Sequence, residues 1–297
     1  MLQKTLRAPC HIQGIGVHSG REVAISLLPA PPDTGILFRL ENGRGNGKEH
    51  VDVPAHSDFI TSTTMNTSLG RDGREIRTVE HLLAALVGME VDNVVIRTHG
   101  AEIPAMDGSA LPFVSRIMEV GRETQPAPRK FLRIKAPITV EEGEKSVGLY
   151  PSDVPTFSCE IDFPHPAVGY QQLKIHLSPQ VFVSDLAKAR TFGFEEEMKD
   201  LHRRGLARGG SLDNGIGLGE NGKVLNPDGL RYPDEFVRHK ILDAVGDLAL
   251  AGATILGEYR AVKPGHSIHR RLLHELRDNP ERWEIVSASE TQQAQAG

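Results

Sequence analysis

Short β-type runs and longer helical runs alternate along this chain, and the same order occurs twice. In the first half, glycine or proline interrupts brief stretches in which apolar and polar residues alternate, which predicts antiparallel strands joined by turns. The predicted strands are HIQGIGVHSG, EVAISLLPA, GILFRLEN and, further on, VDNVVIRTH. Helical spacing predicts helices at RTVEHLLAALVGME, beginning near Thr78 as the capping residue, and at LPFVSRIMEVG. This mixture of strands and helices indicates an α+β fold.

The pattern restarts after a polar segment with two prolines, 121–130, which we interpret as a linker. Strands are predicted at FLRIKAPITVEEG, KSVGLYPS, PTFSCEIDF and GEYRAVKP, and helices over 233–252 and 267–277. Because both halves show strands first and helices later, a duplicated α+β unit is favoured. We expect an N-terminal domain over 1–124, a C-terminal domain over 125–286 and a disordered tail over 287–297.

The predicted helix over 233–252 carries charge where a core helix should be apolar. Its apolar residues recur at helical spacing, so most of its circumference should be buried. Yet His239, Asp243 and Asp247 follow one another at four-residue steps. A buried histidine and buried carboxylates are costly unless they are paired, hydrogen-bonded or bound to a metal. The rest of the sequence must therefore supply partners for this helix.

Composition excludes several classes of function. A length of 297 residues, 25% of them charged, is typical of an ordinary soluble protein of about two domains. The formal net charge of -5 provides no basic surface for nucleic acid. The first residues lack the apolar core of a signal peptide, and no apolar run reaches the ~20 residues of a membrane span, so we expect a cytoplasmic protein. Only Cys10 and Cys159 are present, which leaves histidine and carboxylate as plausible metal ligands.

Spacing alone is weak evidence for a metal site, since chance would place roughly 0.7 His–Asp pairs at this spacing in such a chain. Residues i and i+4 share one helix face, however, so His239 and Asp243 are able to converge on one ion. Catalytic zinc usually takes three protein ligands, and His81 is the best third candidate, with Glu80 beside it as a general base. The alternative is that Glu80 and His81 only complement the start of a helix.

His266 follows a glycine after the last predicted strand, in the turn-like sequence PGHSIH. A protonated imidazole at this position could stabilise an oxyanion and then protonate a leaving amine. The alternative is a histidine in a surface turn, without a catalytic role.

Six motifs occur in the order TVEHLLAAL, EIPAMDGSA, LAKARTFGF, RGGSLDN, NPDGLRYPDEFVRHKILDAVGDL and KPGHS. Together they resemble the UDP-3-O-acyl-N-acetylglucosamine deacetylase family, zinc enzymes of lipid A synthesis in Gram-negative bacteria, over nearly the whole chain. The resemblance implies two α+β domains of similar topology, each a sheet packed with helices, with the active site at the domain interface. It also implies a cytoplasmic enzyme, which we expect to be a monomer, that uses one zinc ion to hydrolyse the N-acetyl group of an acylated UDP-sugar.

The resemblance assigns roles to individual residues. The matching positions are the zinc ligands His81, His239 and Asp243, the general base Glu80, the general acid His266, its carboxylate partner Asp247, the oxyanion-supporting Thr191 and the substrate-contacting Lys240. One departure concerns the turn of His266. The family commonly has asparagine three positions after this histidine, whereas this chain has His269, so an imidazole ring replaces an uncharged amide in the hydrogen bonding around the turn.

The resemblance further implies an insert over 192–224 that shapes an apolar passage for the substrate's acyl chain. Small side chains there would leave room between backbones. The residues expected to contact substrate in this insert are Phe192, Met198, Ala207, Gly210, Ser211, Gly215 and Gly217. Phe163 matches an aromatic residue at the nucleotide end. A flexible glycine loop and a core phenylalanine are the respective alternatives.

Two other functions are consistent with parts of the sequence. A non-catalytic module that binds a sugar nucleotide or an acyl chain would keep the pocket and lose the chemistry, but it predicts missing ligands and none is missing. A different zinc amidohydrolase would act on a peptide or a smaller N-acetyl sugar, and the apolar insert argues against it.

Overall fold

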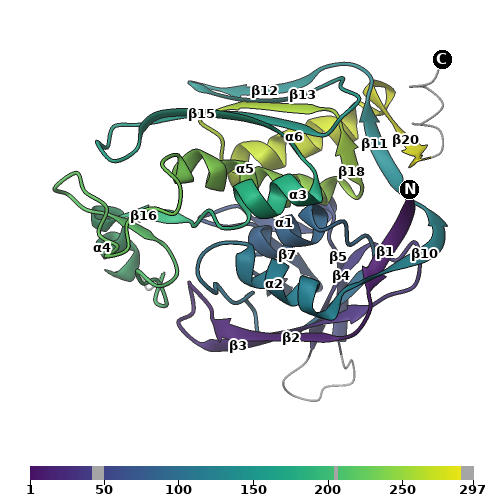
Figure 1. Ribbon diagram of the computed structural model, residues 1–297, viewed down its shortest axis with the longest axis horizontal. Coiled ribbons are helices and arrows are strands. Elements are labelled where there is room, and N and C mark those ends of the chain that lie inside the picture. The colour runs from purple at the N-terminus through teal and green to yellow at the C-terminus, as the bar shows by residue number, and fades with distance from the viewer. Residues whose placement is uncertain (42–49, 204–206, 289–297) are drawn as a thin grey trace.

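The computed structural model describes residues 1–41, 50–203 and 207–288, and within them the protein is built in four layers (Figure 1). A five-stranded sheet lies at each outer face. The helices between the two sheets include α1 (Glu80–Gly88), α2 (Leu111–Val120), α5 (Glu235–Leu248) and α6 (His266–Asp278). Helix α2 packs on the first sheet and α5 and α6 on the second, while α1 contacts α5 across the middle.

The two large sheets have the same topology. The first has the order β2-β3-β9-β4-β5 and the second β12-β13-β19-β14-β15. In each sheet one central pair, β4 with β9 and β14 with β19, is parallel and the other neighbours are antiparallel. Their strands are β2 (Cys10–Ile15), β3 (Glu22–Pro29), β4 (Ile36–Glu41), β5 (His50–Pro54), β9 (Val94–His99), β12 (Ile138–Glu142), β13 (Lys145–Tyr150), β14 (Thr156–Phe163), β15 (Gly169–His176) and β19 (Glu258–Val262). The predicted α+β class is confirmed.

Smaller elements complete the fold. Two three-stranded sheets consist of β6 (Ile60–Ser62), β7 (Ser68–Arg71) and β8 (Arg74–Ile76), and of β11 (Lys130–Ile134), β18 (Thr254–Leu256) and β20 (Trp283–Ser287). Short helical turns are η1 (Ser57–Phe59), α3 (Pro179–Val181), η2 (Phe182–Leu186), η3 (Ala249–Ala251) and η4 (Pro280–Arg282). The predicted insert contains the parallel pair β16 (Phe192–Phe194) and β17 (Ile216–Leu218) and helix α4 (Glu195–Arg203), so it is more than a glycine loop. Of the predicted tail, residues 289–297 lie outside the described residues, and Ser287 ends β20.

The linker predicted over 121–130 is wrong, because most of this segment is a β-strand. Its residues form β10 (Arg122–Pro128), which pairs antiparallel with β1 (Leu2–Leu6) in a two-stranded sheet. Proline lacks the N–H that a ladder needs, but both strands of a two-stranded sheet are edges, where proline is tolerated. The expected domain boundary at residue 124 falls inside this strand, and the division into two domains stays a prediction.

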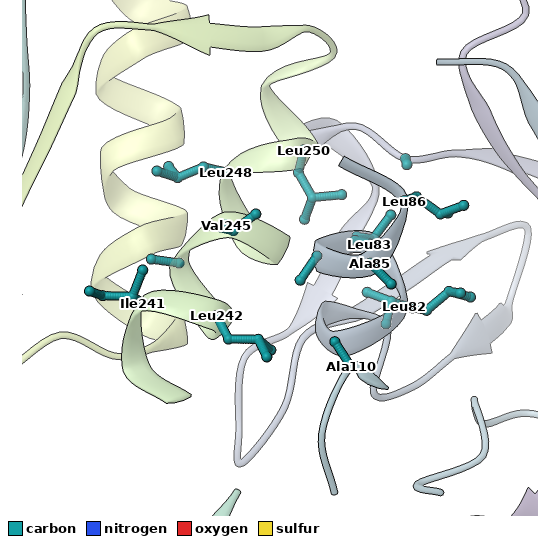
Figure 2. Close-up of a cluster of buried hydrophobic side chains, with 14 of the residues drawn as sticks. Leu82, Leu83, Ala85, Leu86, Ala110, Ile241, Leu242, Val245, Leu248 and Leu250 are labelled. Atoms are coloured by element: carbon teal, nitrogen blue, oxygen red, sulfur yellow. The ribbon is translucent and has the colours of Figure 1, made fainter. Parts of the chain in front are cut away.

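The contact between α1 and α5 holds the two halves of the layered structure together. Figure 2 shows Leu82, Leu83 and Leu86 of α1 on one side of this contact and Leu242 and Val245 of α5 on the other. All five side chains are buried. The predicted helix over 233–252 is confirmed in its centre, with α5 ending at Leu248 and the η3 turn leading to Gly252.

Gly246 lets the backbones of α5 and α1 approach closely. A Cβ atom added at Gly246 would lie 2.0 Å from the carbonyl oxygen of Glu80, a backbone atom. Glycine inside a helix is less stable than alanine by about 1 kcal/mol, so an ordinary helical position would gain from Gly246→Ala. Here we expect the free energy of unfolding to fall by about 3 kcal/mol, because a backbone overlap forces the helices apart. Urea unfolding measures this.

The control for that prediction is Gly265→Ala. Gly265 has extended backbone, and no atom lies within 4 Å of an added Cβ. We expect this variant to unfold at nearly the wild-type urea concentration. Equal or greater stability of Gly246→Ala would contradict the close packing of the two helices.

Candidate metal centre

Three polar side chains meet at the crossing of α1 and α5. His81 Nε2 lies 3.5 Å from Asp243 Oδ1, and His239 Nε2 lies 3.3 Å from the same oxygen. One nitrogen or oxygen atom from each residue lies within 4.8 Å of the others, and all three residues are buried. The structure thus brings together the three residues that the sequence suggested as metal ligands. Helix α5 supplies two of them from one face because they are four residues apart.

A cation would resolve an unfavourable contact at His239. Its Nδ1 lies 3.1 Å from the carbonyl oxygen of Ala189 and therefore carries the proton in this hydrogen bond. Burial lowers the pKa of His239 to about 3, so the ring is neutral and Nε2 offers a lone pair. That lone pair faces Asp243 Oδ1, which is also an acceptor. Two imidazole nitrogens and a carboxylate form a donor set that suits zinc, and the Ala189 contact orients one ligand.

The second oxygen of Asp243 binds Lys240. Lys240 Nζ lies 3.0 Å from Asp243 Oδ2 and 5.5 Å from the centre of the Phe192 ring. Burial alone would raise the pKa of Asp243, but the charge of Lys240 and the hydrogen bond with His81 hold it well below its ordinary value. Asp243 is therefore a carboxylate at neutral pH, with one oxygen free of the lysine and directed to the two histidines. The substrate contact expected of Lys240 stays a prediction.

Glu80 is the first residue of α1 and is buried next to the three ligands. Its Oε2 accepts a hydrogen bond of 3.0 Å from the backbone N–H of Thr67, a residue outside α1. The predicted cap at Thr78 is wrong, because Val79 occupies the cap position without a side-chain hydrogen bond. Burial raises the pKa of Glu80, opposed by the charges of His266 and His81. A carboxyl group with a raised pKa is a stronger base than an exposed one.

His266 faces this carboxyl group from α6. It is the first residue of that helix, and its side chain is only 13% exposed, so the surface-turn alternative is wrong. His266 Nδ1 lies 2.7 Å from Asp247 Oδ2. Burial alone would lower the pKa of His266, but the charge and hydrogen bond of Asp247 raise it to about 10. His266 is therefore an imidazolium at neutral pH, and Nδ1 is occupied, which leaves Nε2–H for a ligand.

Sequence reasoning missed one residue that joins these groups. The Thr67 hydroxyl donates a hydrogen bond of 2.6 Å to Asp247 Oδ1, while the Thr67 backbone N–H binds Glu80. Thr67 comes from the loop before β7, far from either helix in the sequence. No motif around Thr67 indicates this contact, because it depends on how the small sheet packs against the helices.

Phe192 connects the residues expected to contact the substrate with the metal centre. Its ring centre is 6.4 Å from that of His239 and 5.6 Å from that of Phe163. Thr191, the preceding residue, accepts a backbone hydrogen bond from Ile216 and donates one to Gly108. This pairing fixes the start of the insert between the two halves of the chain, and the oxyanion role of Thr191 stays a prediction.

The other insert residues pack mainly against one another. Met198 lies against Gly193 and Gly210, and Gly215 lies against Thr191. Contacts elsewhere in the insert are made by Ala207 with Gly210, Ser211 with Asn214, and Gly217 with Leu212 and Leu225. A cavity of about 470 Å³ lies elsewhere, lined among others by Met1, Arg133 and Ala288, and it includes no predicted site residue. The acyl passage stays a prediction.

None of the helices in the described residues combines the length and the apolar character that a membrane-spanning segment needs.

Comparison with known proteins gives a consistent result. Residues 3–278 match a family model described as UDP-3-O-acyl N-acetylglycosamine deacetylase. A protein of Syntrophotalea carbinolica named UDP-3-O-acyl-N-acetylglucosamine deacetylase is 44% identical over 97% of this chain and 92% of its own length. Proteins of the same name are 45% identical in Saccharophagus degradans, over 96% and 93%, and 44% identical in Myxococcus xanthus, over 96% and 90%.

Proposed function

Because this chain belongs to the UDP-3-O-acyl N-acetylglycosamine deacetylase family, we propose that the centre between α1, α5 and α6 is a metal-dependent amidase site. The protein removes the N-acetyl group of UDP-3-O-acyl-N-acetylglucosamine, and this step belongs to lipid A synthesis. The observation that carries the proposal is the convergence of His81, His239 and Asp243 beside a second pair of groups that can accept and donate a proton. The cytoplasmic location and the monomeric state stay predictions.

The ligands His81, His239 and Asp243 would hold one zinc ion. Zinc, when bound, supplies a Lewis acid that polarises the amide carbonyl and increases the acidity of water. The residues contribute the rest of the site: His239 is held by the Ala189 carbonyl oxygen, and Asp243 by Lys240. A ligand set fixed in this way keeps its geometry while the substrate reacts.

Glu80 and His266 divide the proton transfers between them. Water attacks the carbonyl carbon of the acetamide, and the Glu80 carboxylate accepts a proton from that water. The bond between carbon and nitrogen then breaks, and His266 Nε2–H gives its proton to the departing nitrogen, which leaves as a free amine while acetate remains. The Asp247 carboxylate holds His266 protonated until that step. Thr191 and protonated His266 would stabilise the developing oxyanion.

The substrate end of the site would bind the UDP and acyl groups. Lys240 places a positive charge beside Phe192, where a phosphate could be bound. Phe163, in edge contact with Phe192, would provide an apolar surface for the nucleotide, and the insert over 192–224, which begins at Phe192, would surround the acyl chain.

Acetate release from two substrates tests this function. We expect kcat/KM for UDP-3-O-acyl-N-acetylglucosamine to exceed that for UDP-N-acetylglucosamine by at least about a hundredfold, since each buried methylene contributes about 0.8 kcal/mol. Equal rates on both would contradict the acyl passage. Binding of the acylated sugar to the zinc-loaded protein without any release of acetate would instead indicate a non-catalytic binding module, and faster release from an N-acetyl sugar without the acyl chain would indicate a different amidohydrolase.

A further inference from the structure

His269 lies one helical turn after His266 on α6 and is 1% exposed. Its Nδ1 is 2.7 Å from Asp247 Oδ2, the same oxygen that His266 Nδ1 contacts at 2.7 Å. Its other ring nitrogen, Nε2, is 2.6 Å from the hydroxyl oxygen of Tyr259 on β19. The two histidines therefore share one carboxylate oxygen, and a buried tyrosine closes the far end of the chain of hydrogen bonds.

The Tyr259 contact determines whether His269 Nδ1, which faces Asp247, carries a proton. Burial raises the pKa of Tyr259 well above its ordinary value, so the hydroxyl keeps its proton. If His269 is neutral, the Tyr259 hydroxyl donates to Nε2, and Nδ1 carries the ring proton. If His269 is charged, both nitrogens are donors. In either state Nδ1–H donates to Asp247, which is the only orientation that avoids two acceptors in contact.

Asp247 is thereby bound at both oxygens. The Thr67 hydroxyl donates to Oδ1, and the two histidines donate to Oδ2. The carboxylate is 2% exposed, so these three donors take the place of solvent. A hydrogen bond stabilises the charged form of its acceptor. The second donor on Oδ2 therefore weakens the attraction between this oxygen and His266.

We propose that His269, oriented by Tyr259, is a positioning residue that fixes the Asp247 carboxylate and shares its charge, so that His266 holds its proton less tightly and donates it more readily. This inference rests on the proposed function, since it concerns the general acid of that reaction. A weaker acid donates more slowly to the departing nitrogen, so the shared carboxylate raises the rate of C–N cleavage. The same three groups, Asp247, His266 and His269, could instead hold a second metal ion, and the test must separate these possibilities.

The expected sign follows from the groups around His266. The titratable groups that face it are Asp247 and Asp243 from α5, Glu80 and His81 from α1, and His269, which reaches it through Asp247. Without the Nδ1–H donor of His269, the Asp247 carboxylate would attract the protonated His266 ring more strongly and raise its pKa. The alkaline limb of the pH–rate profile, which reports loss of the His266 proton, should then move to higher pH, while the maximal rate falls.

The test compares His269→Phe, which keeps a ring but no donor, with the wild-type enzyme in its zinc-loaded form. We expect the alkaline limb of kcat/KM to rise by about 0.5 to 1 pH unit and the maximal kcat to fall by about three- to tenfold, with KM nearly unchanged. A titration of the His266 imidazole by 15N NMR should show the same upward shift without any turnover. Tyr259→Phe, which removes only the hydroxyl, should shift the alkaline limb and the NMR titration in the same direction by a smaller amount. This variant provides the test if His269→Phe does not fold.

Two controls accompany these variants. His274→Phe changes another histidine of α6 and should leave the limb and the NMR shift unchanged, while His269→Asn keeps an N–H donor and should shift the limb less than His269→Phe. No shift, or a downward shift, in both His269→Phe and Tyr259→Phe would overturn the proposal, as would a second equivalent of bound zinc that is lost with His269. Absence of acetate release by the wild-type enzyme would refute the proposed function instead, because the NMR titration does not depend on it.

Discussion

Replacing His239 by alanine is expected to remove the bound metal and to lower kcat/KM for deacetylation by at least about a thousandfold. His239 offers one of three convergent ligand atoms, and its Nε2 is the one whose orientation a backbone carbonyl fixes. Metal catalysis of this kind contributes several kcal/mol, and each 1.36 kcal/mol is tenfold in rate. Metal content after gel filtration, together with acetate release, measures both effects.

The matched control for His239→Ala is His99→Ala, at the exposed end of β9. It should keep one equivalent of metal and the wild-type rate. A His239→Ala protein that still bound one equivalent and turned over normally would show that His239 is not a metal ligand.

Replacing Glu80 by glutamine should lower kcat by about a hundred- to ten-thousandfold without loss of the metal, as expected when a general base is removed. The substitution is nearly isosteric, and the amide oxygen is still able to accept the hydrogen bond from the Thr67 N–H. Stability and metal content should therefore change little. Steady-state kinetics with metal analysis of the same sample distinguishes a lost base from a lost ligand.

The pH profile makes the Glu80 prediction more specific. Activity requires Glu80 as a carboxylate, so the wild-type rate should rise with pH through the raised pKa of Glu80 and fall through about 10 as His266 loses its proton. Glu80→Gln should lose the acidic limb and keep the alkaline one. Glu119→Gln, an exposed carboxyl on α2, is the control with both limbs intact. Near-normal turnover or an unchanged acidic limb in Glu80→Gln would refute its role as the base.

The long helices could be predicted from the sequence because their patterns are local. The apolar spacing around Ile241 and Val245 identified α5, and the same kind of spacing identified α1 and α2. Strand β10 could not be predicted in this way, since its residues are polar or proline apart from Ala127 and become a strand only by pairing with β1. The cap of α1 failed for a similar reason: Thr78 adopts a positive φ of 60°, set by the chain around it.

Only part of the candidate site could be predicted from the sequence. The four-residue spacing predicts that His239 and Asp243 share one helix face. Their closeness to His81 depends instead on the packing of α1 on α5, which Gly246 permits. Reasoning from the residues offered His81 as the best candidate for the third ligand, and the family resemblance matched it to that role. The resemblance did not supply Thr67 or Tyr259, whose contacts with Asp247 and His269 arise between segments distant in the chain. His269 was noticed only as a departure from asparagine.

The central claim is that one metal ion, held by His81, His239 and Asp243, makes this protein a deacetylase. The most direct measurement is a titration of the metal-free protein with Zn²⁺ while acetate release from UDP-3-O-acyl-N-acetylglucosamine is followed. We predict that the initial rate starts near zero, rises in proportion to added Zn²⁺ and stops rising at about one equivalent per chain, as a single catalytic site requires. Full activity in the metal-free protein, or none after one equivalent has bound, would contradict the claim.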